Sequence, residues 1–302
     1  MLKEYFIRAK EEKWAIGHFN FSTADQLKAI VEAAAEVKSP VMVATSEGEA
    51  KFIGRAQAVA LVKSWQDLGY PVFLNADHHK TFESAEEAIE EGYDTVLIDA
   101  SKLPFEENIE VTKRVAQYAH DTDPDMMVEG ELGYLRGDSE VQKSVMITVD
   151  DFTNPRQAKE FVERTGVDRL AIVFGNIHGI VEEVMVSTPT PGRAGAPTVT
   201  SGKEQLNIEI LKEVVAAVPD MQIVLHGASG LSDEDVRAAI AAGITNVHIN
   251  TEIRLAYHDA LEKELAKDDE STTPYKFIQP AFDATKELVK KKLELFGSVN
   301  KI

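Results

Sequence analysis

Three histidines that follow separate apolar segments are the residues of this sequence best suited to metal chemistry. His78 comes directly after Asp77 at the end of one apolar run, and His178 and His226 each follow a later run. Three imidazoles with an open fourth position are the usual ligands of catalytic zinc, whereas structural zinc sites are closed by four protein ligands. A lone histidine at a strand end is more often a hydrogen-bonded residue, but three at separate strand ends favour a metal. The sequence therefore predicts a zinc site formed by His78, His178 and His226.

The remaining histidines are expected outside this ligand set. If its strand continues, His79 points to the opposite face from His78, which indicates a supporting or packing residue. His120 and His258 lie in helical patterns and are expected at the surface or in the core. His18 stands near the end of the first apolar run and receives no predicted role.

A glycine-rich turn after His226 is typical of a phosphate site. The run His226-Gly-Ala-Ser-Gly-Leu-Ser-Asp leads into a predicted helix, and the pairs His178-Gly179 and Asn250-Thr251 follow two other strands. Small residues let backbone amides approach an anion, and a helix N-terminus favours negative charge. Such a turn alone usually serves only backbone geometry, but beside a metal site it predicts a phosphate cradle.

The elements that must position these residues alternate along the chain. Apolar runs predict eight strands, over Ala15 to Phe19, Val41 to Thr45, Val72 to Asn75, Thr95 to Asp99, Met126 to Glu131, Arg169 to Phe174, Gln222 to Leu225 and Asn246 to Asn250. Between and after them, helical spacing predicts amphipathic helices, the last two over Thr251 to Ala266 and Pro274 to Phe296.

Continuous apolar strands separated by helices indicate parallel pairing, because a crossover helix returns the chain in the same direction. Eight such units predict an α/β protein with a (β/α)8 TIM barrel, a single domain over residues 1–302 with a C-terminal helical extension. A doubly wound open sheet is the alternative. In a barrel, all the polar strand ends meet at one rim, where active sites lie.

Two connections are longer than simple links require. They run from Leu132 to Asp151 and from Gly179 to Leu206. Connections of this length are usually lids, binding loops or disordered segments. We therefore expect two loops at the rim of the barrel that are mobile without ligand and ordered by a substrate analogue.

Composition limits the partners. The 302 residues include 51 acids against 32 bases and carry a net charge of −19, which disfavours nucleic acid and anionic membranes. A phosphorylated substrate stays compatible, because a local site can be basic or lined by backbone amides. The absence of cysteine excludes disulfides, thiolate catalysis and cysteine-ligated zinc. Without a signal-peptide pattern or a long apolar run, a cytoplasmic protein is expected.

The ordered motifs resemble the class II, metal-dependent aldolases, the family of fructose- and tagatose-bisphosphate aldolases in carbohydrate metabolism. The resemblance covers nearly the whole chain. It is carried by Ala15-Ile-Gly-His-Phe-Asn20, Ser46-Glu-Gly, Asp77-His78, Leu97-Ile-Asp99-Ala-Ser101, Glu129-Gly-Glu131-Leu-Gly133, His178-Gly179, Leu225-His226-Gly-Ala-Ser-Gly230 and Ile249-Asn-Thr251-Glu.

The resemblance implies a role for each matching residue. Asp77 would be the acid and base at the C4 hydroxyl of the substrate, the three histidines would bind zinc, and Asp99 and Glu131 match acids near the metal. The substrate-binding positions are Asn20, Ser46, Gly179, Gly227, Ser229, His248, Asn250, Thr251 and Arg254. Within that set, Gly179, Gly227, Ser229 and Thr251 match the region of the phosphate and a monovalent cation, sodium or potassium. Arg254 matches a position that reaches a neighbouring subunit in some members, and a homodimer or homotetramer is expected.

The sequence departs from the family at two places that bear on substrate. Tyr134-Leu-Arg-Gly-Asp-Ser-Glu140 replaces a run of two glycines and an acid, so either Asp138 or Glu140 would move the C3 proton. On the eighth strand, His248 stands where the family has an asparagine that contacts the triose. An imidazole needs more room there and can become charged.

The resemblance thus implies reversible cleavage of a ketose 1,6-bisphosphate, fructose 1,6-bisphosphate first, to dihydroxyacetone phosphate and an aldehyde phosphate such as glyceraldehyde 3-phosphate. Alternatives are an aldolase for tagatose 1,6-bisphosphate or a phosphorylated deoxy-keto-gluconate, and a non-catalytic sugar-phosphate-binding barrel. A Schiff-base aldolase needs a lysine on a barrel strand, and the predicted strands carry none. A metal-dependent barrel hydrolase would usually have His-X-His on its first strand, where this chain has His18-Phe-Asn20.

Overall fold

Eight parallel strands close into a barrel. The computed structural model describes residues 1–188, 198–267 and 272–302. Around the barrel the order is β1, β11, β10, β7, β5, β4, β3 and β2, and β1 pairs in parallel with both β11 and β2. The strands are β1 (Ile16–Asn20), β2 (Val41–Ser46), β3 (Val72–His79), β4 (Thr95–Ile98), β5 (Met127–Leu132), β7 (Arg169–Ile172), β10 (Gln222–Leu225) and β11 (Ile244–Ile249). The (β/α)8 barrel prediction is confirmed, and the open doubly wound sheet is wrong because β1 and β11 pair and close the sheet.

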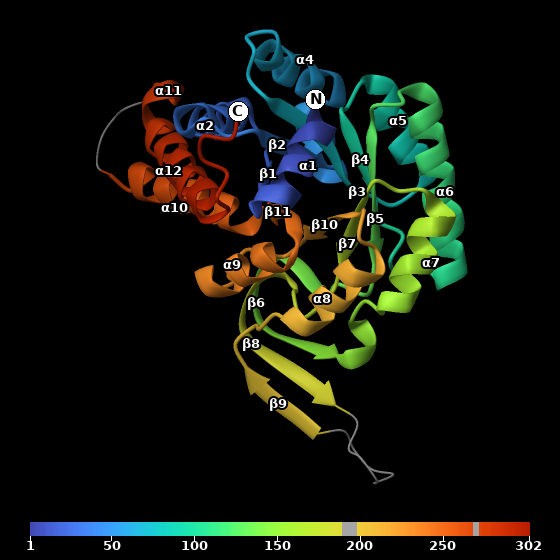
Figure 1. Cartoon of the computed structure of the whole chain (residues 1–302). Helices are drawn as coiled ribbons and strands as arrows, with labels where there is room; N and C mark the ends of the chain where they lie inside the picture. The colour runs from blue at the N-terminus through green and yellow to red at the C-terminus, as the bar shows by residue number, and fades with distance from the viewer. Residues whose placement is uncertain (189–197, 268–271) are drawn as a thin grey trace.

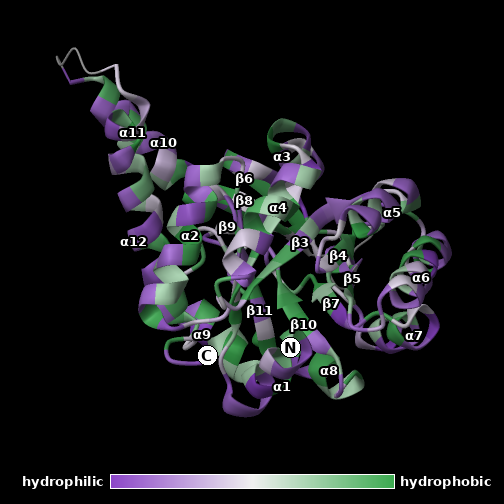
Figure 2. Ribbon diagram, turned by 90° about the horizontal axis from the view of Figure 1, so that it is seen from above, coloured by the Kyte–Doolittle hydropathy of each residue, from purple (hydrophilic) through white to green (hydrophobic). Residues whose placement is uncertain are grey.

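Amphipathic helices surround the barrel. They are α1 (Leu2–Glu12), α2 (Ala24–Val37), α3 (Glu47–Ile53), α4 (Arg55–Gln66), α5 (Phe82–Glu91), α6 (Phe105–Thr122), α7 (Pro155–Thr165), α8 (Ile208–Ala217), α9 (Asp233–Ala242), α10 (Thr251–Leu265), α11 (Pro274–Phe277) and α12 (Gln279–Leu295), with a 3-10 turn at Val149–Asp151. Figure 1 shows α5, α6 and α7 on one side of the strands and α2, α10 and α12 on the other. Hydrophobic residues gather on the central strands and hydrophilic ones on the outer faces of the helices (Figure 2). None of the described helices is long and apolar enough to span a membrane.

Side chains at the helix starts satisfy amide groups that the helix itself leaves free. Thr23 accepts a hydrogen bond from the backbone N–H of Gln26 at the start of α2. Ser46 and Glu49 form a reciprocal capping box at the start of α3. This short helix is not among the predicted ones, and it fixes Ser46 and Glu49 at the end of β2.

The first and last helices of the chain both pack against the rest of the fold. Helix α1 buries Leu2 and Phe6 in one apolar cluster with Ile16, Phe73 and Met127, which stand at the starts of their strands or next to them. This packing seals the N-terminal end of the barrel, so polar groups in its interior are shielded from water. Helix α12, the predicted C-terminal extension, packs against α2 and α10.

The two long connections contain strands, so their prediction as loops is wrong. Strands β6 (Gly137–Thr148), β8 (His178–Thr188) and β9 (Thr198–Gly202) form a second sheet, in which β6 and β8 are parallel and β8 and β9 antiparallel. Figure 1 shows β8 and β9 projecting together away from the barrel. Val145 and Ile147 of β6 are buried on either side of the exposed Met146, and together with Val184 of β8 they pack against Ile177. Residues 189–197, part of the second connection, lie outside the described residues.

Candidate active site

A cavity of about 540 Å³ opens at the C-terminal end of the barrel. The predicted site residues that line it are Asn20, Ser46, Asp77, His78, Asp99, Glu131, Asp138, His178, Gly179, His226, Gly227, Ser229, His248, Asn250, Thr251 and Arg254. Glu140 is exposed on β6 and is not among the residues that line this cavity. Because parallel strands all point the same way, residues from distant parts of the chain meet at this one rim.

An irregularity in β3 turns two consecutive side chains into the cavity. A regular strand sends neighbouring side chains to opposite faces. In β3 the pairing with β4 shifts between Ala76 and His79, and His78 has a φ of 51°. Both Asp77 and His78 line the cavity as a result. Such bulges often re-aim side chains beside active sites.

The three predicted ligand histidines come together. Each offers a ring nitrogen, and these nitrogens all lie within 4.8 Å of one another. His78 belongs to β3, His178 begins β8, and His226 directly follows β10. Burial and the neighbouring rings of His78 and His226 lower the pKa of His178 to about 3, so this imidazole is neutral and has a lone pair to offer a metal.

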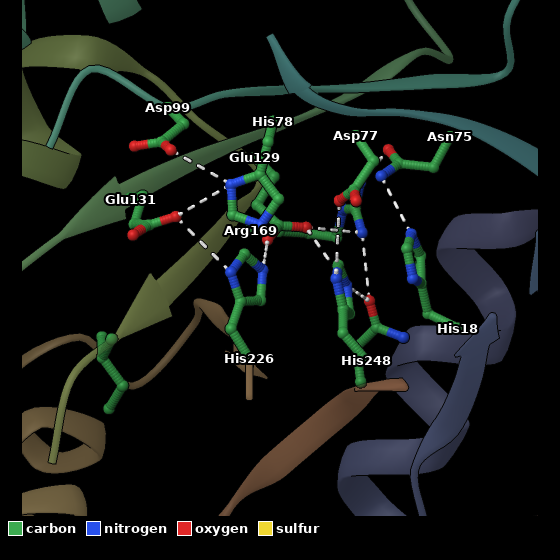
Figure 3. Close-up of polar contacts among 12 residues, drawn as sticks. His18, Asn75, Asp77, His78, Asp99, Glu129, Glu131, Arg169, His226 and His248 are labelled. Carbon is green, nitrogen blue, oxygen red and sulfur yellow. Dashed lines mark hydrogen bonds and ion pairs between the residues drawn. The ribbon is translucent and has the colours of Figure 1, made fainter. Parts of the chain in front are cut away.

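Three carboxylates lie next to His78 and His226 (Figure 3). The Nε2 atom of His226 lies 2.7 Å from Glu129, and its Nδ1 atom lies 3.4 Å from Glu131. The Nδ1 atom of His78 lies 3.1 Å from Asp99 and 3.6 Å from Glu131. Metal-binding histidines usually carry a carboxylate on the ring nitrogen that faces away from the metal.

This arrangement fits a divalent cation. The Nδ1 atom of His226 and the Oε2 atom of Glu131 are buried and have no hydrogen-bond partner. Burial lowers the pKa of the His226 ring, but the neighbouring carboxylates of Glu129 and Glu131 outweigh this effect and raise the pKa to about 10. At His78, burial lowers the pKa, but Asp77 and Asp99 outweigh this effect and raise the pKa to about 9. The carboxylates thus require positive charge at the histidines, which protons or a metal ion supply.

Asp77 is held as a carboxylate next to this cluster. Asn20 donates a hydrogen bond of 2.9 Å to Oδ2 of Asp77, and Oδ1 is buried without a partner. Burial raises the pKa of Asp77, but the charges of His78, His18 and His226 outweigh it and lower the pKa to about 2. Asp77 is therefore ionised at neutral pH and can accept a proton.

The outer part of the cavity offers donors and positive charge for anions. Lys80, Lys102 and Arg254 line it, although the chain as a whole is strongly acidic. Arg254 donates to the hydroxyl of Ser139, which also lies 3.3 Å from the hydroxyl of Thr251. The turn after β10 depends on glycine, since Gly227 has a φ of +66° and a Cβ there would lie 1.9 Å from a backbone oxygen.

Several site residues are missing from the predicted set. Glu129 contacts the Nε2 atom of His226. Glu129 and Glu131 are two residues apart on β5, and this spacing predicts that both side chains lie on the same face of the strand. Glu49 accepts hydrogen bonds from Asn20 and the backbone of Ser46. The capping motif Ser46-x-x-Glu49 was the available signal for it.

The remaining histidines differ in their surroundings. His18 is buried, with its ring stacked 3.5 Å from that of His248, and burial lowers its pKa to about 4. His79 is buried and makes a 2.8 Å hydrogen bond to the carbonyl of Ser84, in agreement with a packing residue. His120 pairs with Asp168 at 2.8 Å, and His258 is exposed on α10.

Comparisons with known proteins agree with this geometry. The family described as fructose-bisphosphate aldolase class-II matches residues 1–301. The fructose-bisphosphate aldolase of Thermus caldophilus is 36% identical over 307 residues, which cover 99% of this chain and 98% of the relative. That of Staphylococcus epidermidis strain RP62A is 34% identical over 306 residues, again 99% of this chain and 98% of the relative.

Solved structures share the fold over the full length. The crystal structure of the YdjI aldolase from Escherichia coli K12 is 31% identical and has a TM-score of 0.80, covering 100% of this chain and 98% of that one. The fructose-bisphosphate aldolase of Campylobacter jejuni is 23% identical, with a TM-score of 0.75 over 100% of this chain and 95% of that one, which shows the fold.

The fold, the site and these relatives define an aldolase, a lyase built on a (β/α)8 barrel. More particularly, the chain belongs to the class-II fructose-bisphosphate aldolase family.

Proposed function

We propose that this aldolase is zinc-dependent and reversibly cleaves a ketose 1,6-bisphosphate, with fructose 1,6-bisphosphate as the first candidate. The products are dihydroxyacetone phosphate and an aldehyde phosphate such as glyceraldehyde 3-phosphate. The observation that carries the proposal is the meeting of His78, His178 and His226 beside the ionised Asp77 in one cavity. Zinc bound there supplies a Lewis acid for the ketose carbonyl oxygen.

Asp77 is the base of the cleavage step. Its carboxylate takes the proton of the C4 hydroxyl as the C3–C4 bond breaks, and it returns that proton in the condensation direction. The hydrogen bond from Asn20 supports this role because it holds one carboxylate oxygen and leaves the other without a partner. Proton transfer by a positioned group of this kind contributes about 10²–10⁴-fold to the rate.

Asp138 is the group that delivers a proton to C3 after cleavage. It lines the cavity from the start of β6, whereas Glu140 stands on the same strand outside the lining residues. A proton donor must reach its acceptor within hydrogen-bond distance, directly or through one water. This requirement favours Asp138 over Glu140.

Charge supports binding of two phosphates. The amides around Gly179 and Gly227, with Ser229 and Thr251, would hold one phosphate and a monovalent cation. Arg254 with Ser46, Lys80 and Lys102 supplies donors for the other. We further propose that the chain acts in the cytoplasm and that it forms a homodimer or homotetramer. Light scattering tests the second proposal because it measures the molar mass of the assembly.

A kinetic panel tests the function. Zinc-loaded protein is assayed for release of dihydroxyacetone phosphate from fructose 1,6-bisphosphate, tagatose 1,6-bisphosphate and a phosphorylated deoxy-keto-gluconate. The expected result is cleavage of a hexose bisphosphate that a chelator abolishes and zinc restores. The imidazole of His248 in place of an asparagine is the observation that keeps the other two ketoses in the panel.

Asp77→Asn tests the mechanism. It should retain zinc and lose about 10²–10⁴-fold in turnover, while Asp67→Asn on the exposed end of α4 serves as the control. Near-normal turnover of Asp77→Asn would move the base elsewhere. Borohydride trapping of substrate on a lysine would refute the metal mechanism. Tight binding of sugar phosphate without any turnover would support a binding protein.

A further inference from the structure

A network of buried polar side chains on the barrel strands includes Arg169, Glu129 and Asn75 (Figure 3). Arg169 of β7 is fully buried and lies 2.8 Å from Glu129 of β5. The same guanidinium donates to the side-chain oxygens of Asn75 on β3 and Asn246 on β11, at 3.1 Å each. A guanidinium only donates hydrogen bonds, so these contacts fix which end of each asparagine amide faces Arg169.

The fixed amides determine where two histidines carry their protons. The oxygen of Asn246 faces both Arg169 and, at 3.1 Å, the Nε2 atom of His248. Since this oxygen can only accept, Nε2 of His248 must donate, and the neutral ring keeps a lone pair on Nδ1. Asn75 presents its NH2 group to Nε2 of His18 at 3.0 Å, so the proton of His18 lies on its Nδ1.

Stacking fixes the orientation of His248 as well as its tautomer. The ring of His18 lies parallel to that of His248, with centroids 3.5 Å apart and planes inclined by 5°. The ring of His226 covers the other face at 4.3 Å and 29°. Both faces of the His248 ring are covered, and its Nε2 atom is bonded to Asn246. The ring therefore presents only its Nδ1 atom, with a lone pair, to the cavity that it lines.

This lone pair faces a second acceptor. Nδ1 of His248 lies 3.8 Å from Oδ1 of Asp77, the carboxylate oxygen without a partner. Neither atom carries a proton, so neither can donate a hydrogen bond to the other. A single hydroxyl has one proton to donate, so both acceptors are satisfied only by a water or by two hydroxyls of a ligand.

A second metal site is not formed by His18, Asp77 and His248, although their ligand atoms lie within 4.8 Å of one another. An imidazole lone pair lies in the plane of its ring. The planes of His18 and His248 are nearly parallel and stacked, so their lone pairs cannot converge on one ion. In addition, Asn75 already occupies Nε2 of His18, the only nitrogen of that ring with a lone pair.

We propose that His248 is a specificity-determining residue, a fixed acceptor for the substrate hydroxyl next to the one that donates to Asp77. The site thereby selects phosphorylated ketoses with two adjacent hydroxyls at this point and rejects the analogue that lacks the second one. Asn246 and Arg169 are positioning residues that act through the tautomer of His248. This inference rests on the proposed function and adds the feature of the substrate that the site recognises.

The first test measures binding without turnover. Calorimetry on the zinc-loaded protein compares glucitol 1,6-bisphosphate with its 3-deoxy and 5-deoxy analogues, each of which lacks one neighbour of the C4 hydroxyl. Leaving a buried acceptor unsatisfied should weaken binding of one deoxy analogue by about 10–100-fold. His248→Phe keeps an aromatic ring and removes the acceptor, so the parent and that analogue should bind it equally. His258→Phe on the exposed part of α10 is the matched control and should discriminate like wild type.

The second test reads the tautomer directly. In nitrogen-15 spectra of histidine-labelled, zinc-loaded protein, the signals that His248→Asn removes should belong to a protonated Nε2 and an unprotonated Nδ1. Asn246→Leu should shift these signals toward a mixture of tautomers and reduce the discrimination measured above.

The outcomes separate the inference from the function on which it rests. A protonated Nδ1 at His248, or equal discrimination by wild type and His248→Phe, overturns the inference. Tight binding of both deoxy analogues by wild type overturns it as well. If the parent bisphosphate does not bind wild type, the proposed substrate is wrong, and the nitrogen spectra still decide the tautomer.

Discussion

Replacing Arg169 by methionine tests the buried network that supports the site. Both Arg169 and Glu129 are fully buried and lie 2.8 Å apart. Breaking a buried ion pair by removing one partner typically costs about 3–5 kcal/mol, because the other charge stays buried without compensation. We place the expected loss at the lower end, about 3 kcal/mol. Glu129 retains its 2.7 Å contact with His226.

The amide oxygens that lose Arg169 keep other donors, which also limits the loss. Asn75 still accepts from the hydroxyl of Thr95, and Asn246 still accepts from His248. Methionine fills much of the space beside Phe6, whose ring lies 5.6 Å from the guanidinium. A loss of this size is a large part of a typical stability of about 5–15 kcal/mol, yet the protein should stay folded.

The assay is equilibrium unfolding in urea with the metal removed, so that zinc binding does not add to the apparent stability. Arg164→Met breaks an exposed ion pair with Glu106 and is the control, with an expected loss of about 1 kcal/mol or less. The double variant Arg169→Met with Glu129→Gln should lose less than the sum of the two single variants, by about 0.5–3 kcal/mol. A loss below about 1 kcal/mol for Arg169→Met, or simple additivity, would refute the reasoning.

Three further predictions follow from single residues. His226→Ala should reduce the zinc content, measured by mass spectrometry, from about one per chain to almost none, whereas His258→Ala should retain it; full metal in the first variant removes His226 from the ligand set. Gly227→Ala should cost about 2–4 kcal/mol in urea unfolding, because its Cβ would lie 1.9 Å from a backbone oxygen; Gly166→Ala also has positive φ, meets nothing within 4 Å and should cost less, and equal losses would contradict this reason. Burial raises the pKa of Glu204 from 4.5 to about 8, so the folded protein holds a proton that the unfolded chain releases between these pH values. The free energy of unfolding should therefore fall as pH rises through this window, and Glu204→Gln should remove that part of the fall; identical pH profiles would count against it.

Most of the barrel could be predicted because its signals are local. Apolar runs and helical spacing are properties of neighbouring residues, and the parallel direction follows from their alternation. The second sheet was missed because the alternation in β6 and β8 is weak. Val145 of β6 packs with Val184 of β8 and with Ile177, which directly precedes β8, so the buried face becomes clear only when the two strands pair.

The same distinction holds within the site. The parallel direction of the strands brings their ends to one rim, so a polar residue at a strand end could be assigned to the cavity from its position alone. His178, His226 and Asp77 were found in this way. The sequence could not separate Asp138 from Glu140, because the facing of a β6 residue depends on how that strand packs over the barrel.

By itself, the sequence determined the barrel, the three histidines and the aspartate that share its rim, since local periodicity and strand direction suffice for these. Only the tertiary structure decided the bulge that turns both Asp77 and His78 inward. It also decided the tautomer of His248, which depends on an amide that Arg169 orients from another strand. Hydrogen bonds between residues far apart in the chain fix these features, and no local pattern of residues encodes them.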